Sequence, residues 1–538
     1  MTRTRSTRRA GTRPTAAAPA GTAPARATGA GTIAFILLLA VPRIVRMAWP
    51  QVWIEDESYL NGAFMLATGH APYTGFALPH FPLLEGALAV LLRIFPASIR
   101  TAEAFTQAAA FTASLFIWRI GRRLGGRWCG AAAALVFAVS PIVFRYHVFE
   151  REVFLIVPVL AAAWLVLRDG GDEAAGATRR GLATGALLAV AMAIKLTAAS
   201  YAVAVFLFLL FARRRREALA CAASLVILMG TATIGLLAWF GMPFFVQVIL
   251  FRLVHAGFPS WAGRFVEFLR SVDLAFAAGV VGLVIVVVAG RARRWALPLL
   301  LLGAGFLLLV VLNPTFWAHD SVELLPWLAL FAGVTVAAIA DAWRRPADEA
   351  ETIRLSRGAA AVAAIVTLAL LVFVTPVRHE GWGPGASSAY GFGYRDRSEI
   401  DQVAAFIRAR TSPGERVAVP PILAFQANRP ELVVYPELAG TMMQLQAQVT
   451  AQGWLRTWRQ SDIGKKMFWD EVAASRDAWL PMLARAIEQH TVGAVVDFSP
   501  DDLFPVPLID VPAPTLRQYG YTPGLATTHY QVWVPAGT

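Results

Sequence analysis

The sequence is poor in cysteine, in lysine and in charged residues generally. Its 538 residues include two cysteines, Cys129 and Cys221, which lie far apart. Two cysteines cannot build a disulfide framework, and their separation lacks the spacing of metal ligands. Lysine occurs three times, so arginine supplies 45 of the 48 basic residues (48 less 3). Charged residues make up 15% of the chain, against about 25% in soluble proteins, which excludes an ordinary soluble protein.

Long apolar runs dominate the sequence instead. Hydrophobic residues make up 57% of the chain, and its mean hydropathy is +0.56. Many runs are long enough to cross a hydrocarbon core of about 30 Å. We therefore predict a polytopic α-helical membrane protein with about eleven spans. The predicted spans lie near residues 32–49, 103–121, 128–144, 153–168, 181–194, 196–211, 219–240, 272–290, 296–312, 321–340 and 358–375.

The arginines indicate which side of the membrane each loop occupies. Residues 1–30 carry six arginines and no acid, which is typical of a disordered basic tail. No small-residue cleavage site follows the first apolar run, so we interpret that run as an uncleaved anchor. With the tail in the cytoplasm, the alternation of spans places every arginine-rich loop inside, as the positive-inside rule requires. The net charge of +13 therefore indicates topology and not nucleic-acid binding.

The segment 81–96, FPLLEGALAVLLRIFP, is apolar but is not counted as a span. It is short, carries Glu85 and Arg93, and ends in proline. An amphipathic helix in the outer membrane interface fits this pattern better. Counting it as a span would also invert the arginine pattern of the later loops.

The composition changes after residue 375. Residues 376–538 carry 14 basic and 16 acidic side chains. SEIDQVAAFIRARTSPGERVAVPP predicts a helix, a turn and a strand, and DAWLPMLARAIEQH predicts a helix before the strand VGAVVDF. ELVVYP predicts another short strand. We therefore predict a cytoplasmic tail (1–30), a transmembrane domain (31–375) and an extracytoplasmic α/β domain (376–538).

Acidic and basic residues near the predicted outer face form three groups. They follow the first span, lie between the third and fourth spans, and stand at the mouth of the tenth. Carboxylates and basic groups at one interface can accept a proton while binding a phosphate. Loop charges are ordinarily solvated, so a functional interpretation requires the three loops to meet in space. The groups are Glu55, Asp56 and Glu57; Glu150, Arg151 and Glu152; and His319, Asp320 and Glu323.

Three basic residues of the membrane part are candidates for a functional site. Arg43 and Arg46 lie near the outer end of the first span, where snorkelling to the headgroups explains them as well as a function does. Lys195 lies between two apolar runs and is the only lysine in this part of the chain. We interpret it as an isolated ammonium that its apolar neighbours do not stabilise. We therefore predict a functional role for it.

Several short motifs follow one another between residues 32 and 340. After the first span come EDESYLNGAFMLATGHAPYTGF and PHFPLLEGALAVLLRIFP, then WRIGRRLGGRW, SPIVFRYHVFEREVFLIVPVLAAAWLVL and GLATGALLAVAMAIKLTAA. Their order and spacing resemble the GT-C membrane glycosyltransferases, and most closely the branch of the protein O-mannosyltransferases and the lipid A aminoarabinose transferase. HDSVELLPWLALFAG resembles the start of a later, His-containing span of that family.

The resemblance implies roles for particular residues. A carboxylate in the first outer loop is the general base of such enzymes, and by motif position this is Asp56, with Glu57 beside it. The acid of the second outer loop falls on Glu152, with Glu150 as the substitute, although the family often has Asp there. Lys195 matches the basic residue that contacts the carrier phosphate. We predict further substrate contacts from Arg43, Arg151, His319 and Tyr59.

The resemblance also implies an activity and its partners. Such enzymes move a sugar from a polyprenyl-phosphate carrier to an acceptor hydroxyl at the outer face of the bacterial inner membrane. The acceptor is a lipid, a protein or a cell-wall glycan, and a direct displacement would invert the anomeric centre. This branch generally requires no metal, whereas oligosaccharyltransferases do, and the acidic triplet leaves room for a divalent metal. We expect no other cofactor.

Two other classes of protein remain as alternatives. A transporter or flippase of lipid-linked sugars would share the spans and the buried charges, but would not need an outer domain or an acidic first loop. A membrane-anchored scaffold would place the function in residues 376–538, but eleven spans exceed the need of an anchor.

Overall fold

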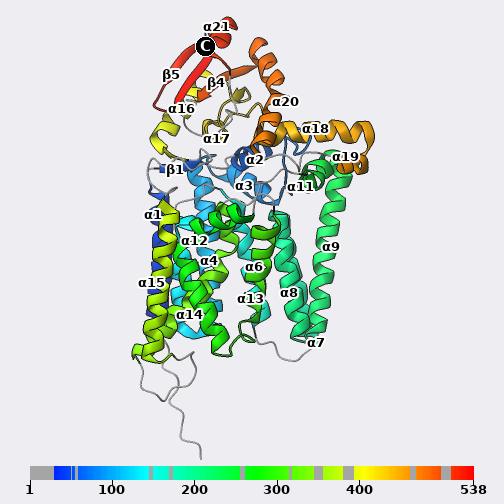
Figure 1. Ribbon diagram of the computed structural model, residues 1–538. Helices are drawn as coiled ribbons and strands as arrows, with labels where there is room; N and C mark the ends of the chain where they lie inside the picture. The colour runs from blue at the N-terminus through cyan, green and yellow to red at the C-terminus, as the bar shows by residue number, and fades with distance from the viewer. Residues whose placement is uncertain are drawn as a thin grey trace, which may run out of the picture.

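The computed structural model consists mainly of helices that stand side by side in a bundle, with a small sheet above one end (Figure 1). We call that end of the bundle the sheet end. The residues that it describes are 29–49, 51–54, 58–144, 149–168, 174–254, 261–313, 318–344, 355–379, 393–434, 436–460, 468–498 and 511–537.

Each predicted span overlaps one or two helical elements of the bundle, as expected of apolar runs whose backbone hydrogen bonds must be satisfied internally in lipid. Three described helices are long and apolar enough to cross a membrane: Ala175–Ile194, Arg215–Phe240 and Leu325–Trp343. The number of spans stays a prediction. The long helices are α1 (Gly29–Met47), α4 (Ile99–Val139), α6 (Arg151–Leu167), α7 (Ala174–Ile194), α8 (Ala199–Phe211), α9 (Arg215–Phe240), α12 (Trp261–Val288), α13 (Ala296–Phe306), α14 (Leu325–Arg344) and α15 (Arg357–His379).

The element α4 consists of two helices joined at Gly126, whose φ of 88° is non-helical. The chain doubles back there, because a Cβ on Gly121 would lie only 2.7 Å from the Cα of Gly130. Residues nine apart in a straight helix are separated by about 13 Å along its axis. The two predicted spans 103–121 and 128–144 are therefore the two arms of this hairpin, and glycine permits their close approach.

Short elements interrupt or connect the long helices at several points. The π-helical segment η2 follows α9 and leads into α11, and η4 immediately precedes α14. Such interruptions are frequent at functional sites. The short elements are α5 (Pro141–Phe144), η1 (Leu196–Ala198), α10 (Met242–Phe244), η2 (Phe245–Leu250), α11 (Phe251–Val254), η3 (Leu307–Leu312) and η4 (Ala318–Glu323).

Two short helices, α2 (Ser58–Ala67) and α3 (Leu83–Ile94), lie between the bundle and the sheet (Figure 1). The helix predicted within 81–96 is confirmed as α3. Leu84 and Leu88 are buried while Val90 is 57% exposed, which is the amphipathic pattern expected. Its place in a membrane interface stays a prediction.

The C-terminal region folds around a four-stranded sheet with the order β3-β4-β6-β5. The predicted helix and strand after residue 397 are confirmed as α16 and β3, and the predicted helix and strand before residue 498 as α20 and β4. The elements are β3 (Arg416–Ala418), β4 (Val492–Phe498), β5 (Tyr521–Ala526), β6 (Tyr530–Pro535), α16 (Arg397–Arg410), α17 (Pro421–Ala427), α18 (Pro436–Gln452), α19 (Trp454–Gln460), α20 (Phe468–Glu488) and α21 (Ala513–Gln518).

The strand predicted for ELVVYP is wrong. Of its described residues, Glu431 forms an isolated bridge with Val417, and the residues that follow it bend away towards α18. The segment is bounded by Pro430 and Pro436, and proline cannot donate to a ladder.

Contacts between distant segments fix the C-terminal region to the sheet end of the bundle. β1 (Gln51–Ile54), just after α1, pairs antiparallel with β2 (Gly393–Asp396). The carboxylate of Glu103 on α4 contacts Arg46 of α1 at 3.1 Å and Arg397 of α16 at 2.9 Å. The amide of Asn61 on α2 donates to the carboxylate of Glu431. The region is thus held directly above the helix ends where the predicted site residues lie.

Candidate active site

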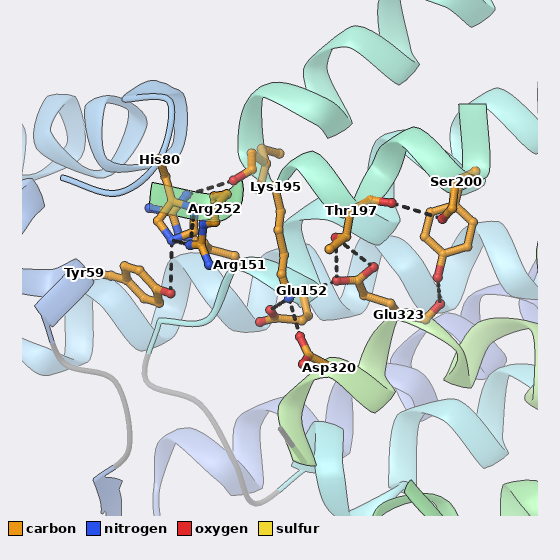
Figure 2. A network of polar contacts seen from close by, with 12 residues as sticks. Tyr59, His80, Arg151, Glu152, Lys195, Thr197, Ser200, Arg252, Asp320 and Glu323 are labelled. Carbon is orange, nitrogen blue, oxygen red and sulfur yellow. Dashed lines mark hydrogen bonds and ion pairs between the residues drawn. The ribbon is translucent and has the colours of Figure 1, made fainter. Parts of the chain in front are cut away.

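The side chain of Lys195 lies at the centre of a buried polar cluster at the sheet end of the bundle (Figure 2). Its ammonium forms ion pairs with the carboxylates of Glu152 and Asp320, and with Oε1 of Glu323 at 3.0 Å. The three carboxylates are almost fully buried, whereas the lysine side chain is 15% exposed. The interpretation of Lys195 as an isolated ammonium is therefore wrong, because three carboxylates hold it.

The cluster forms where the ends of separate elements meet. Lys195 follows the last residue of α7, Glu152 lies in the first turn of α6, and Glu323 ends η4. The hydroxyl of Thr197 donates to the Glu323 carboxylate at 3.0 and 3.2 Å. The hydroxyl of Tyr201 donates to the backbone oxygen of Glu323 at 2.9 Å. These contacts fix the position of Glu323 opposite the lysine.

A second group of side chains adjoins the cluster through Arg151, next in the chain to Glu152 (Figure 2). Arg151 pairs with the buried carboxylate of Glu85 on α3 and donates to the backbone oxygen of Ile194 at 2.8 Å. Its guanidinium carbon lies 4.4 Å from the centre of the Tyr59 ring. Arg151 thus links α6 to α7, α3 and α2, and it orients Tyr59 towards the cluster.

His80 lies beside this second group and contacts side chains of two elements. Its Nε2 is 3.4 Å from the hydroxyl of Tyr59, and the guanidinium of Arg252 on α11 donates to it at 2.7 Å. Burial, together with the positive charge of Arg151 and of other nearby bases, holds the pKa of His80 well below its ordinary value. The imidazole is therefore neutral at neutral pH, and a ring nitrogen can accept the hydrogen bond of Arg252.

In the ion pairs described above, several carboxylates share one cation. One ammonium is shared by Glu152, Asp320 and Glu323, and Glu150 is buried next to them. The second oxygen of Glu152, Oε2, is buried and has no hydrogen-bond partner among the described residues. A buried carboxylate oxygen without a hydrogen-bond partner is stabilised by binding a proton, a cation or a hydroxyl group.

Two sets of side chains in the site have the geometry of metal ligands. Atoms of Glu150, Glu152 and His319 lie within 4.8 Å of one another, as do atoms of Glu152, Asp320 and Glu323. The second set already surrounds the Lys195 ammonium. The first set, two carboxylates and an imidazole, suits a divalent metal such as Mn²⁺ or Zn²⁺. The sequence leaves room for a metal at residues 55–57 instead, and those residues lie outside the described part of the chain.

The predicted site residues are distributed as follows. The structure brings Glu150, Arg151, Glu152, Lys195 and His319 together, so two of the three loops predicted to converge do meet. Tyr59 joins them through Arg151 and His80. Arg43 lies elsewhere: its guanidinium donates to the side chain of Gln107 at 3.1 Å and to the backbone oxygens of Ala138 and Val143. Asp56 and Glu57, with Glu55, lie outside the described residues.

Sequence reasoning did not single out four residues of the site, namely Glu85 as a partner of Arg151, His80, Thr197 and Arg252. The histidine stands in the motif PHFP, and a histidine next to a predicted interface helix was the available signal. Arg252 follows the π-helical η2, a feature that no sequence pattern indicated. Thr197 is an ordinary residue of an apolar run, and only the fold places its hydroxyl on Glu323.

Comparison with known proteins gives matches in sequence and in structure. Residues 79–239 match a protein-family model described as dolichyl-phosphate-mannose-protein mannosyltransferase. No curated protein sequence matches the chain. The crystal structure of ArnT from Cupriavidus metallidurans bound to undecaprenyl phosphate is similar with a TM-score of 0.62 and 13% identity, over 95% of this chain and 99% of that chain.

A second similar structure is the archaeal oligosaccharyltransferase AglB from Archaeoglobus fulgidus, in complex with an inhibitory peptide and a dolichol-phosphate. Its TM-score is 0.51 at 13% identity, over 86% of this chain and 69% of that chain. At identities this low, structural similarity establishes the fold alone, because function depends on the individual site. The resemblance predicted from the sequence motifs is thereby confirmed: this chain is a multi-pass membrane protein with the fold of the GT-C membrane glycosyltransferases.

Proposed function

We propose that this protein is a glycosyltransferase that moves a sugar from a polyprenyl-phosphate carrier to an acceptor hydroxyl, with inversion at the anomeric carbon. One observation carries the proposal. A charge-dense site of Lys195, Glu152, Asp320 and Glu323 lies buried at one end of an apolar bundle. The fold around it matches, over nearly its whole length, a structure with a bound polyprenyl phosphate.

The position of the site suits a donor that is part lipid and part sugar phosphate. Ionisable groups inside a membrane protein are expensive and mark function. Here they lie at helix ends, where the polar head of a carrier can reach them while its polyprenyl chain stays between apolar helices. Lys195 and Arg151 are the proposed ligands of the phosphate. Carboxylates already hold each of these cations in position. A phosphate oxygen of the donor would take the place of one carboxylate oxygen beside Lys195 or Arg151.

The proposed reaction requires two things of the chain. The acceptor hydroxyl must lose its proton as its oxygen attacks the anomeric carbon, and Asp56 is the proposed base. The bond between that carbon and the phosphate oxygen breaks, and the departing phosphate gains negative charge that Lys195 would stabilise. Glu152, with one oxygen on Lys195, would orient the ammonium. Glu150, Glu152 and His319 would hold a divalent metal if one is used, and it would neutralise charge on the leaving phosphate.

The orientation of the chain completes the proposal. The N-terminus is in the cytoplasm, and the C-terminal region and the site face the outside of a bacterial inner membrane. The arginine-rich loops of the sequence support this topology. Residues 376–538 would form a domain that shapes the access of the acceptor and supplies no catalytic group. The acceptor is a lipid, a protein or a cell-wall glycan.

The test uses the full chain in liposomes with a panel of polyprenyl-phosphate sugars labelled in the sugar. We expect one donor to release polyprenyl phosphate while the label passes to an acceptor. Asp56→Asn should keep donor binding and lose about 10²–10⁴-fold in turnover, as the loss of a general base does. Glu399→Gln, which removes a carboxylate far from the site in sequence, is the matched control and should retain turnover.

A transporter would give a different result in the same liposomes. The label would stay on the carrier and become accessible to an impermeant reagent on the opposite side of the bilayer. That outcome, with Asp56→Asn equal to the wild type, would contradict the proposal.

A further inference from the structure

The helix α19, WLRTWRQ, presents a row of apolar side chains that are each about half exposed. Trp454 is 46% exposed, Leu455 42% and Trp458 45%. At about 100° per residue these three occupy one arc of the helix surface. Thr457 is buried on one side of that arc. Arg456 and Arg459 are exposed on the other side. The helix is therefore amphipathic, with a basic edge next to its apolar face.

The long helix α9, which ends below α19, is apolar and almost uncovered. Only 6% of its most apolar window is buried inside the protein. Val226 and Ile234 are each 69% exposed, and Trp239, near its end, is 84% exposed. In a multi-pass membrane protein such a surface is covered by acyl chains. The tryptophan near the end of α9 then marks the level of the membrane interface, where this residue is enriched.

The two apolar surfaces meet at the sheet end of α9. Figure 1 shows α18 and α19 lying across this end of the helix. The ring of Trp454 lies 5.6 Å from the ring of Phe245, which begins η2 a few residues after α9 ends. The apolar face of α19 therefore begins next to the segment that follows the sheet end of α9.

We propose that α19 lies in the headgroup layer of the leaflet on the sheet side, with Trp454, Leu455 and Trp458 inserted into the lipid. Arg456 and Arg459 would contact phospholipid phosphates, which have the opposite charge. Three side chains are far too few for a stable contact with a second copy, which needs about 800 Å² from each partner. A bilayer surface needs no such area from one element, because α9 already anchors the chain in it.

This attachment has a connection to the candidate site. In η2, the side chain of Gln247 accepts a hydrogen bond from the backbone N–H of Leu78 at 2.8 Å and donates one to the backbone oxygen of Tyr73 at 2.8 Å. The segment so held leads directly to His80. The lipid-bound α19 would thus set the depth in the membrane of η2 and of the segment that carries His80. The inference does not depend on the proposed reaction.

The test measures the depth of a nitroxide spin label in vesicles of phosphatidylethanolamine and phosphatidylglycerol. Cys129→Ala with Cys221→Ala gives a cysteine-free chain, and both native cysteines are buried. Labels are then attached at Trp458→Cys, at Leu455→Cys, and at Gln448→Cys on an exposed position of α18 as the matched control. We expect the labels on α19 to collide more with oxygen than with a water-soluble nickel chelate, and the control label to show the reverse.

Two outcomes would overturn the inference. Equal nickel accessibility at residues 455, 458 and 448 would place α19 in water. Low accessibility to both reagents, with dipolar broadening between labels, would mean that a second copy covers the face. Arg456→Gln with Arg459→Gln should move the label at residue 458 towards water in these vesicles, and an unchanged depth would refute the contact with phosphates. Size-exclusion elution and circular dichroism of each labelled chain check that it is folded.

Discussion

Two buried clusters of charge lie at the sheet end of the bundle, and the ion pairs described in them are arranged in opposite ways. In one, the single carboxylate of Glu103 lies between the guanidiniums of Arg46 and Arg397. In the other, the single ammonium of Lys195 lies among three carboxylates. Among the contacts of the described residues, two cations share one carboxylate in the first cluster and three carboxylates share one cation in the second, although both are formed by residues far apart in the sequence.

The difference indicates different tasks. Glu103 is 1% exposed, and its cluster joins α1, α4 and α16, so that it fastens the C-terminal region to the bundle. The Lys195 side chain keeps 15% of its surface exposed, and Oε2 of Glu152 lacks a hydrogen-bond partner among the described residues. Burying charge is costly. We infer that the first cluster bears this cost because it fastens the C-terminal region to the bundle. The second cluster bears it because its charged groups take part in the proposed reaction.

The largest expected effect is that of Lys195→Met. Losing a charge-assisted hydrogen bond to the donor phosphate should lower transfer by about 10–150-fold. Removing the ammonium also takes away the cation that three buried carboxylates share, which should lower the free energy of unfolding by about 3–5 kcal/mol. Transfer is measured per folded molecule in liposomes, and stability by thermal unfolding in detergent.

Lys195→Arg is the matched control, because it keeps the positive charge. It should recover most of the stability but not the transfer, since the geometry around the phosphate changes. If Lys195→Met bound the polyprenyl-phosphate sugar as tightly as the wild type, the phosphate would need another ligand and the difference between the two clusters would lose its functional meaning.

The second prediction concerns Glu103→Gln. This change removes the carboxylate that the buried guanidiniums of Arg46 and Arg397 share, so the free energy of unfolding should fall by about 3–5 kcal/mol. Transfer per folded molecule should stay unchanged, because no contact of Glu103 reaches the Lys195 cluster among the residues that the structure describes. A loss of turnover at unchanged stability would show that the two clusters are not separate in function.

The third prediction is for Arg43→Met. Its guanidinium binds backbone oxygens of Ala138 and Val143 and the side chain of Gln107. Losing such bonds to a charged group should cost about 1.5–3 kcal/mol of stability, and the KM for the donor should not change. A raised KM would restore the role in phosphate binding that the sequence predicts for this residue.

The smallest expected effect is the dependence of stability on pH caused by His80. Its folded pKa is lowered, so below about pH 6.5 the unfolded chain binds a proton that the native chain does not. The native state should therefore lose about 1.4 kcal/mol per pH unit as the pH falls below that value.

His80→Gln lacks this titration and provides the comparison. The unfolding free energy of the wild type minus that of the variant should decline on acidification below about pH 6.5. A flat difference between pH 7 and pH 5 would mean that the native imidazole is protonated in spite of the guanidiniums beside it.

The sequence by itself determined the helices of the bundle, the short amphipathic helix α3, and the order of α16 before β3 and of α20 before β4. These elements are fixed locally, because the length and periodicity of an apolar run decide whether a helix or a strand forms. Pairing between strands was not determined in this way. ELVVYP has the residues of a strand but pairs with Val417 only through the single bridge of Glu431, and β1 pairs with β2 more than three hundred residues later.

The site shows the same division. The sequence placed Glu150, Glu152, Lys195, His319, Asp320 and Glu323 on one side of the membrane, because the positions of charges between apolar runs follow from topology. Only the tertiary structure decided that Lys195 is held by three carboxylates, that Arg43 is bound to the end of another helix, and that His80 and Arg252 join the site. The charged groups that a site contains are those that packing brings within contact distance. The packing of helix ends sets those distances.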